Sequence, residues 1–233
     1  MARPKTSLLS RRSVIEAALK LIDDTGLSGW SLRKLAEQLG VHESSVYYYY
    51  RYKSEIYADV LRYVLAEFDD EGTEDLEDWK AYLLAFGPRY YQALAAHPNV
   101  VGVLLQETPR TFGLAREERT ADVLLDVGFP ARYVIAIREQ LEALIVGSLQ
   151  FAVSDLFGEV PEEHKQLHLA VKAARDVSAA EQFDMALQAY VEGLEVQLTG
   201  WLTDTDNRKP AKKSSVNGRI ATASRRPAKK AST

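Results

Sequence analysis

The period of the apolar side chains constrains the fold more than any other feature of this sequence. These side chains recur three and four positions apart along most of the 233 residues, which is the spacing of an amphipathic helix. Val14, Ala18 and Leu21 belong to one such stripe, and Gly26 marks its expected end. We find no convincing alternation of apolar and polar residues of the kind typical of half-buried strands. The sequence therefore predicts an all-α protein.

Two short helical segments follow the first helix closely. Ser31 occupies an N-cap position before residues at helical spacing, and Gly40 ends that segment. Residues 42–50 form the next short segment, and a further helix begins near Lys53. Two short helices joined by a tight, glycine-containing turn behind a longer helix are typical of a helix-turn-helix DNA-binding domain. We expect this three-helix domain to span residues 1–53.

Charge is distributed unevenly along the chain. Residues 1–53 carry nine Lys and Arg against five acidic residues, and residues 208–233 carry nine basic residues and no acidic one. Residues 54–207 between them have 11 basic and 28 acidic residues. Basic ends can meet DNA phosphates, whereas the middle cannot, although ordinary fluctuation of surface charge is an alternative explanation. Residues 203–233 have almost no large apolar side chain, so we predict a disordered basic tail that adds nonspecific affinity for DNA.

The segment SLRKLAEQLGV at 31–41, followed by VYYYY at 46–50 and by Lys53, closely resembles the signature of the TetR (tetracycline repressor) family. The resemblance implies a sequence-specific transcriptional regulator, usually a repressor, that binds a palindromic DNA operator as a homodimer and is released by a small molecule. The residues that it implies for DNA binding are Arg33, His42, Glu43, Ser44, Ser45, Tyr47, Tyr48 and Lys53. Of these, Arg33 would read a guanine, Tyr48 would contact the DNA backbone and Lys53 would hold a phosphate.

Other interpretations of these residues stay open at this point. The run of tyrosines can simply pack, and we expect Val46 and Tyr50 to face the interior of the domain. Solvated surface positions are the alternative for Arg33, Tyr48 and Lys53. Glu43 departs from the expected chemistry, because a carboxylate repels phosphate unless it accepts a hydrogen bond from a cytosine amino group.

Longer helical segments follow, and we expect residues 54–202 to form a larger helical ligand-binding and dimerisation domain. The expected helices cover about 75–96, 98–105 and 114–127, then a long segment from Pro130 to about Phe157, one from Pro161, and a last one over 179–202. Pro88 lies inside the first of these and should kink it, because proline removes a backbone donor.

Residues 76–157 resemble, more loosely, the ligand-binding domain of the tetracycline repressors themselves. Asp69, Phe86 and Leu104 stand where the drug-sensing members have polar groups, and a leucine cannot ligate a metal. The resemblance therefore argues against a magnesium–tetracycline complex, and we expect a small apolar or aromatic effector, bound without a metal or another cofactor. The candidate pocket residues are Phe86, Tyr90, Leu104, Gln106, Phe112 and Phe151, although aromatic stripes also form ordinary core.

Wide apolar stripes mark the helix after Pro130 and the last helix. Two copies of each could form a four-helix dimer bundle, although packing within one subunit would account for part of each stripe. The residues predicted at the dimer interface are Leu141, Leu144, Tyr190, Leu194 and Leu198.

Other functions have less support in the sequence. His164 and His168 have the i, i+4 spacing of a metal pair, but their charged neighbours favour an exposed helix. The chain contains no cysteine, phosphate-binding glycine loop or hydrolase motif, so we expect no enzyme, and an all-helical enzyme using scattered carboxylates stays the alternative. A nonspecific architectural DNA-binding protein built on the basic tail is the second alternative. Without an apolar signal segment or membrane span, we expect a cytoplasmic protein.

Overall fold

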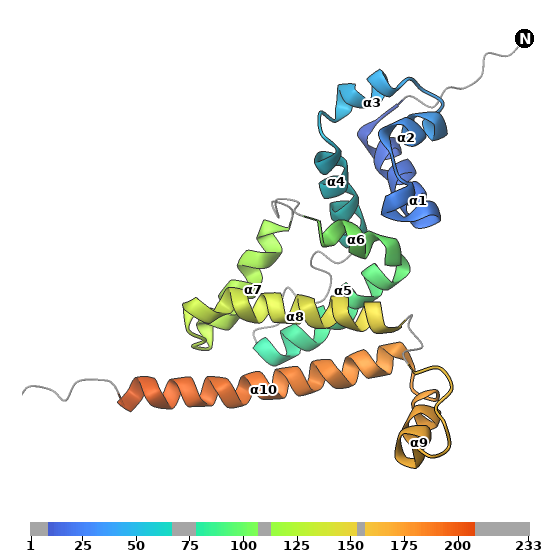
Figure 1. Cartoon of the computed structure of the whole chain (residues 1–233). Coiled ribbons are helices and arrows are strands. Elements are labelled where there is room, and N and C mark those ends of the chain that lie inside the picture. The colour runs from blue at the N-terminus through green and yellow to red at the C-terminus, as the bar shows by residue number, and fades with distance from the viewer. Residues whose placement is uncertain (1–8, 67–77, 107–112, 153–156, 208–233) are drawn as a thin grey trace, which may run out of the picture.

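The computed structural model describes residues 9–66, 78–106, 113–152 and 157–207. Within those ranges the chain forms ten α-helices and one short 3-10 segment and has no strand, which confirms the predicted all-α class (Figure 1). Two residues named above, Asp69 and Phe112, lie outside the described residues, as does the tail from residue 208. None of the described helices is both long and apolar enough to cross a membrane.

The N-terminal unit contains α1 (Arg11–Gly29), α2 (Leu32–Leu39) and α3 (Glu43–Tyr49). Ser10 begins α1 with a capping box, in which its hydroxyl accepts a hydrogen bond from the backbone N–H of Ser13. The predicted stop at Gly26 is a break inside α1, because Gly26 has a φ of 66° and the last turn follows it. Ser31 and Gly40 cap the two ends of α2 as the sequence predicts.

α4 (Lys53–Ala66) closes this unit and leads from it to the rest of the chain (Figure 1). Its Ile56 is completely buried together with Val14 and Ile22 of α1, Leu35 of α2 and Val46 of α3. These side chains come from all four helices, so a single apolar core fixes the angles between them.

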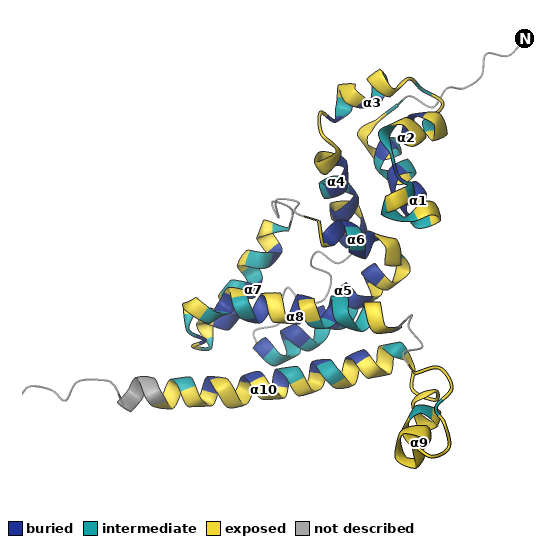
Figure 2. Ribbon diagram, viewed as in Figure 1, coloured by how far each residue is buried: buried dark blue, intermediate teal, exposed yellow. Residues whose placement is uncertain are grey.

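The C-terminal body is built on three long helices, α5 (Trp79–Ala96), α8 (Ala131–Ala152) and α10 (Ala179–Asn207). α10 runs beside both α5 and α8 (Figure 1). The shorter elements are η1 (Pro98–Val100), α6 (Val101–Leu104), α7 (Leu114–Asp126) and α9 (Lys165–Ala174). α9 projects from the body and buries none of its residues in the chain (Figures 1 and 2).

The packing of α5 on α10 depends on one close approach. The Tyr91 and Phe183 rings stack with their centroids 4.6 Å apart. Nearby, a Cβ added at Gly87 would lie 2.7 Å from Cδ2 of the buried Leu187, so the glycine lets the two helices meet. α5 remains helical through the next residue, Pro88.

Some helix boundaries differ from the expected ones. α9 begins at Lys165, four residues after Pro161, rather than at the proline. α10 extends to Asn207, although residues from Thr203 onward were expected to be disordered. The extension has a simple reason, because no glycine or proline follows Gly200 until Pro210.

Leu141, Leu194 and Leu198, which were predicted at a dimer interface, are buried within the single subunit. They are only 1%, 2% and 8% exposed in the single chain, and they lie in the core where α8 packs on α10. A side chain already covered inside its own subunit has almost no apolar area left to bury against a partner. Leu144 and Tyr190 are half-buried, and the Tyr190 hydroxyl donates a hydrogen bond to the backbone oxygen of Ile137 over 2.7 Å.

The end of α1 contacts the segment that joins α5 to α6. Nδ1 of His97 lies 2.8 Å from Oδ2 of Asp23, and the Asn99 amide donates to the Asp23 backbone oxygen over 2.9 Å. One turn further, a Cβ added at Gly102 of α6 would lie 2.9 Å from Cδ1 of Leu27. The segment 97–102 therefore connects the N-terminal unit directly to the body.

Candidate DNA-binding surface and ligand cavity

α3 has one buried face and one exposed face (Figure 2). Val46 and Tyr50 point into the core, which confirms the expectation that they face the interior. His42, Glu43 and Ser44 are exposed at the beginning of the helix, and Ser45 is half-buried beside them. Tyr47 and Tyr48 are exposed further along, and Tyr48 is 86% exposed. The polar residues predicted to read bases therefore lie at the N-terminal end of a helix whose outer side is free in this chain.

The two other tyrosines of the run hold α3 in place. The Tyr49 hydroxyl donates a hydrogen bond to the backbone oxygen of Leu9 over 2.6 Å. The buried Tyr50 hydroxyl donates to Oδ2 of Asp59 on α4 over 2.8 Å, and the Arg11 guanidinium lies 5.0 Å from the Tyr50 ring centroid. Burial, and then the Asp59 carboxylate, raise the pKa of Tyr50 well above its usual range, so this hydroxyl stays a donor.

Arg33 is exposed on α2 and is oriented by its own helix. Its Nε donates to Oε1 of Glu37 over 3.0 Å. The hydrogen bond uses only Nε, so the two terminal nitrogens of the guanidinium keep their own donors. A guanidinium held in this way still has the two donors that a guanine edge requires.

Lys53 lies at the first turn of α4, as predicted, but its ammonium group rests on aromatic rings. Nζ is 4.3 Å from the ring centroid of Trp30 and 5.5 Å from that of Tyr57. This contact was not predicted from the sequence, and neither was a role for two exposed neighbours, Arg51 and Tyr52. Their position between α3 and Lys53 is the signal that could have identified them.

A cavity of about 250 Å³ lies in the C-terminal body between α5, α6, α7 and α8. Its lining residues are Tyr90, Leu104, Leu114, Arg116, Glu117, Ile135, Arg138, Glu139 and Glu142. Tyr90 and Leu104 were predicted to line a pocket, and both do. Phe86 is buried behind them, with its ring centroid 5.5 Å from that of Tyr90, and it is not part of the lining.

Two other predicted pocket residues lie away from this cavity. Gln106 is exposed just beyond α6 and is not among the lining residues. Phe151 is exposed near the end of α8, in a separate shallow groove that it shares with Leu144, Gly147 and Met185. Phe151 lies 13 residues after Arg138, a lining residue of the cavity on the same helix, so the two are separated by about 20 Å along α8. This distance excludes Phe151 from the cavity.

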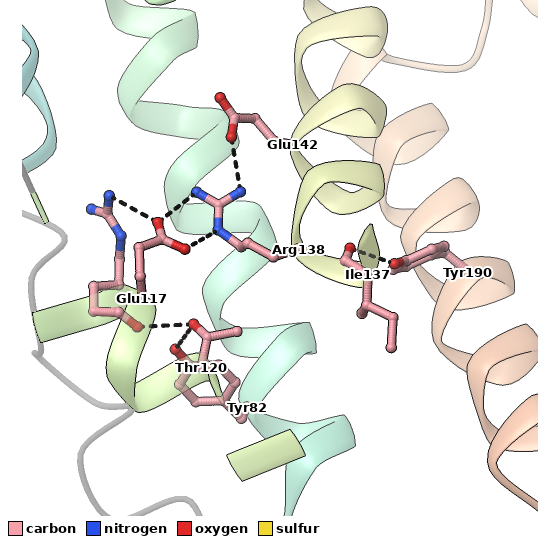
Figure 3. A network of polar contacts seen from close by, with 8 residues as sticks. Tyr82, Glu117, Thr120, Ile137, Arg138, Glu142 and Tyr190 are labelled. Atoms are coloured by element: carbon pink, nitrogen blue, oxygen red, sulfur yellow. Dashed lines mark hydrogen bonds and ion pairs between the residues drawn. The ribbon is translucent and has the colours of Figure 1, made fainter. Parts of the chain in front are cut away.

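A buried ionic network forms the inner wall of the cavity (Figure 3). Nε and Nη2 of Arg138 each lie 3.0 Å from a carboxylate oxygen of Glu117, and Nη1 donates to Oε2 of Glu142 over 3.0 Å. Burial lowers the pKa of Arg138, but the carboxylates of Glu117 and Glu142 together with Tyr90 outweigh burial, and the net effect raises it. Arg138 is therefore charged at all ordinary pH values, although its side chain is almost fully shielded from water.

The same wall includes Arg116 and a hydrogen-bonded pair behind it. The Arg116 guanidinium lies 5.6 Å from the Tyr90 ring centroid, and a Cβ at Gly113 would lie 2.6 Å from its Nη2. Gly113, with a φ of 75°, thus leaves room for this guanidinium. Deeper in the wall, the hydroxyls of Tyr82 and Thr120 are 2.8 Å apart, and Thr120 donates to the Arg116 backbone oxygen over 3.0 Å (Figure 3).

The charged residues of this wall were not predicted, although the sequence contains a signal for them. Arg138 and Glu142 fall on the buried stripe of α8 that contains Val134, Leu141 and Ile145. Charged residues are almost never fully buried unless they are paired, so two of them at i, i+4 on an apolar face predict a buried ion pair.

The histidine pair lies elsewhere on the molecule. His164 and His168 are exposed at the start of α9, and Nδ1 of His168 is 3.1 Å from the backbone oxygen of Val160. In the part of the chain that the structure describes, no three His, Asp or Glu side chains are grouped so as to hold a metal ion.

Comparisons with known proteins agree with this architecture. Residues 14–60 match the family described as bacterial regulatory proteins, tetR family. The class A tetracycline repressor protein from transposon 1721 of Escherichia coli is 26% identical over 196 residues, which cover 80% of this chain and 90% of that protein.

Two solved structures share the fold. A TetR variant from Acinetobacter baumannii AYE in complex with minocycline has a TM-score of 0.62 and 21% identity, over 81% of this chain and 98% of that one. The TetR family protein ActR of Streptomyces coelicolor, in complex with (S)-DNPA, has a TM-score of 0.66 and 19% identity over the same shares. The helix-turn-helix unit at residues 14–60 therefore matches the tetR family of bacterial regulatory proteins, and the chain as a whole is similar to its members.

Proposed function

We propose that this protein is a transcriptional repressor that binds a palindromic operator as a homodimer and is released from it by a small molecule. The observation that carries the proposal is the exposed outer face of α3, which is held rigidly by Tyr49 and Tyr50 and has polar side chains at its N-terminal end. That is the geometry with which a recognition helix enters the major groove.

Each exposed residue of this surface has a distinct role in the proposal. Arg33 reads a guanine with its terminal nitrogens while Glu37 holds its Nε. His42, Glu43, Ser44 and Ser45 face base edges. Tyr47, Tyr48 and Lys53 contact the backbone, and Lys53 leaves the Trp30 ring to reach a phosphate.

The dimer that we propose uses a different face of α8 and α10 from the one predicted. Met185, Ala189, Gly193 and Val196 are exposed and lie on one side of α10, opposite the buried leucines. On α8, Leu144, Gly147 and Phe151 share the side that adjoins this face. A Cβ added at Gly147 or Gly193 would meet nothing within 4 Å in the single chain. Because glycine inside a helix costs about 1 kcal/mol relative to alanine, close packing against a partner helix would explain both residues.

The ligand of the proposed repressor binds in the cavity beside Tyr90. Most of the surface that lines it is apolar, and two arginines and three glutamates add charged groups to it. An amphipathic small molecule therefore fits better than a purely apolar one.

The route from this cavity to the DNA-binding unit is short. Leu104 lines the cavity and is the last residue of α6, and Gly102 of the same turn faces Leu27 of α1. A ligand that displaces Leu104 would shift α6 against α1 and change the spacing of the two recognition helices in the dimer. A hundredfold release of DNA requires about 2.7 kcal/mol of difference in ligand affinity between the two states.

Footprinting of the full chain on the DNA that flanks its own gene tests the proposal. We expect protection of two half-sites with centres about 10 bp apart, or a little more. Arg33→Ala should lose discrimination at one position of the site, by about 1–3 kcal/mol. Lys20→Ala is the matched control, because Lys20 is exposed and ion-paired on α1, away from α3. Uniform protection of any sequence would favour the architectural DNA-binding protein instead, and turnover of a bound compound would favour an enzyme.

A further inference from the structure

The cavity has an electrostatic character that the proposed function does not specify. Its lining contains two guanidinium groups and three carboxylates, those of Glu117, Glu139 and Glu142. We infer that the effector is a small amphipathic cation, with an aromatic or alkyl body and a protonated amine. The inference rests on the proposed function only for the premise that this cavity binds the effector.

The apolar body of such a ligand has a complementary wall. Leu114 of α7 and Ile135 of α8 line the cavity and are each 62% exposed, so apolar surface is available at its mouth. Tyr90 and Leu104 continue this wall inward and are buried. A volume of about 250 Å³ is slightly smaller than that of typical drug sites, and it suits one ring with a short chain.

The buried arginine is already engaged by carboxylates. All three nitrogens of the Arg138 guanidinium pair with carboxylates, two positions with Glu117 and one with Glu142. An anionic ligand would have to take one of these positions and displace a carboxylate. Displacing Glu117 or Glu142 would break an ion pair that is largely shielded from water, which is unfavourable. Arg138 therefore offers no free position to an anion.

A cation can bind without breaking any of these pairs. Glu139 lies three residues before Glu142 on α8, so both carboxylates share the side of the helix that faces the cavity. Glu139 is exposed, and it has no hydrogen bond or ion pair with any residue that the structure describes. An ammonium group beside it would gain a charge-assisted hydrogen bond while the body of the ligand covers Ile135.

The C-terminal body as a whole carries a net negative charge, as the lining of the cavity does. Residues 54–207 carry 28 acidic residues against 11 basic ones, whereas the bases are concentrated at the two ends of the chain. A negative potential around the body raises the local concentration of cations at the mouth of the cavity and repels anions.

Three probes of similar size test this inference, namely 4-phenylbutylamine, 4-phenylbutan-1-ol and 4-phenylbutyrate. Each is titrated calorimetrically into the full chain at low ionic strength. We expect the amine to bind about tenfold more tightly than the carboxylate, which corresponds to about 1.4 kcal/mol, with the alcohol between them. Equal or tighter binding of the carboxylate overturns the inference, as does the absence of saturable binding of the amine.

Variants locate the binding. Glu139→Gln should weaken binding of the amine severalfold and leave binding of the alcohol unchanged. Glu118→Gln on α7 is the matched control, because Glu118 is exposed and does not line the cavity. A loss of amine affinity that is equal in both variants would mean that only general charge is sensed, which overturns the assigned site.

Operator binding is measured in parallel so that the two proposals fail separately. If the protein gives specific footprints but does not bind the amine, the cationic effector is rejected and the proposed repressor function is retained. Saturable, Glu139-dependent amine binding without any specific footprint supports the cation site and rejects the repressor.

Discussion

The rings of Tyr48 and Tyr49 meet edge to face, with centroids 5.3 Å apart and an interplanar angle of 83°, but the two hydroxyls have opposite surroundings. That of Tyr49 is bonded to the Leu9 backbone oxygen, whereas Tyr48 is almost fully exposed. Two neighbouring residues of the same type can therefore be separated by experiment into a structural and a DNA-contacting role.

Replacement of each tyrosine by phenylalanine removes one hydroxyl and little else. Tyr49→Phe should lower the free energy of unfolding by about 1 kcal/mol, because it deletes one intramolecular hydrogen bond. Tyr48→Phe should leave that free energy unchanged and should weaken operator binding through the loss of a phosphate contact. Urea unfolding and fluorescence anisotropy with labelled operator measure the two effects. The assignment of roles would be wrong if Tyr48→Phe changed stability and Tyr49→Phe did not.

The buried pairing of Arg138 predicts a large loss of stability. Arg138→Ala leaves Glu117 and Glu142 without their shared partner, and we expect the free energy of unfolding to fall by about 3–5 kcal/mol. Arg132→Ala, on the exposed part of the same helix, should change it by less than about 0.5 kcal/mol. Chemical unfolding is compared at one protein concentration, since dissociation of a dimer contributes to apparent stability. Similar losses in the two variants would contradict the buried network.

The contact of Asp23 with His97 predicts a variant that still binds DNA but responds poorly to its ligand. Asp23→Ala removes the side-chain contact between α1 and the segment before α6, while the recognition helix keeps its own supports. We expect operator affinity within about twofold of that of the unaltered protein, and a reduction of ligand-induced release of about fivefold or more. Asp24→Ala is a matched control, because Asp24 is exposed and pairs with Lys20 on the same helix. An unchanged ligand response in Asp23→Ala would move the coupling route elsewhere.

The exposed glycine of α10 distinguishes the proposed interface from the predicted one. Gly193→Arg should yield a folded monomer with its helical circular dichroism retained, because the position is open in the single chain and close to the partner in the proposed dimer. Leu194→Asp places a charge in the core of the subunit and should unfold it instead. Sedimentation velocity measures the mass of each variant, with Asp122→Arg on the exposed side of α7 as control. A dimeric Gly193→Arg protein would exclude this face.

The DNA-binding unit could be predicted well from the sequence, because its signals are local. Ser31 and Gly40 fix the ends of α2, and the period of Val46 and Tyr50 fixes which side of α3 is buried. The C-terminal body could be predicted only in outline. The stripe that contains Leu194 shows that a face is buried, but the period does not tell whether the covering helix belongs to the same chain or to another copy.

The cavity was the least predictable part for a related reason. Phe151 and Arg138 lie on one helix, yet its length separates them, and only Arg138 reaches the wall built by α5 and α7. The ion pair between Arg138 and Glu117 forms only because α8 and α7 lie side by side, and the apolar stripe of neither helix predicts that arrangement.

The position of Lys53 over Trp30 has a consequence for observing the protein at work. Trp30 is the only tryptophan among the residues 1–66, and the other two, Trp79 and Trp201, lie in the C-terminal body. An ammonium group 4.3 Å from the indole is close enough to affect its emission, and that group must move away if it is to reach a phosphate. With Trp79 and Trp201 replaced by phenylalanine, the emission of Trp30 would report arrival at the operator and departure from it in real time, without any attached dye.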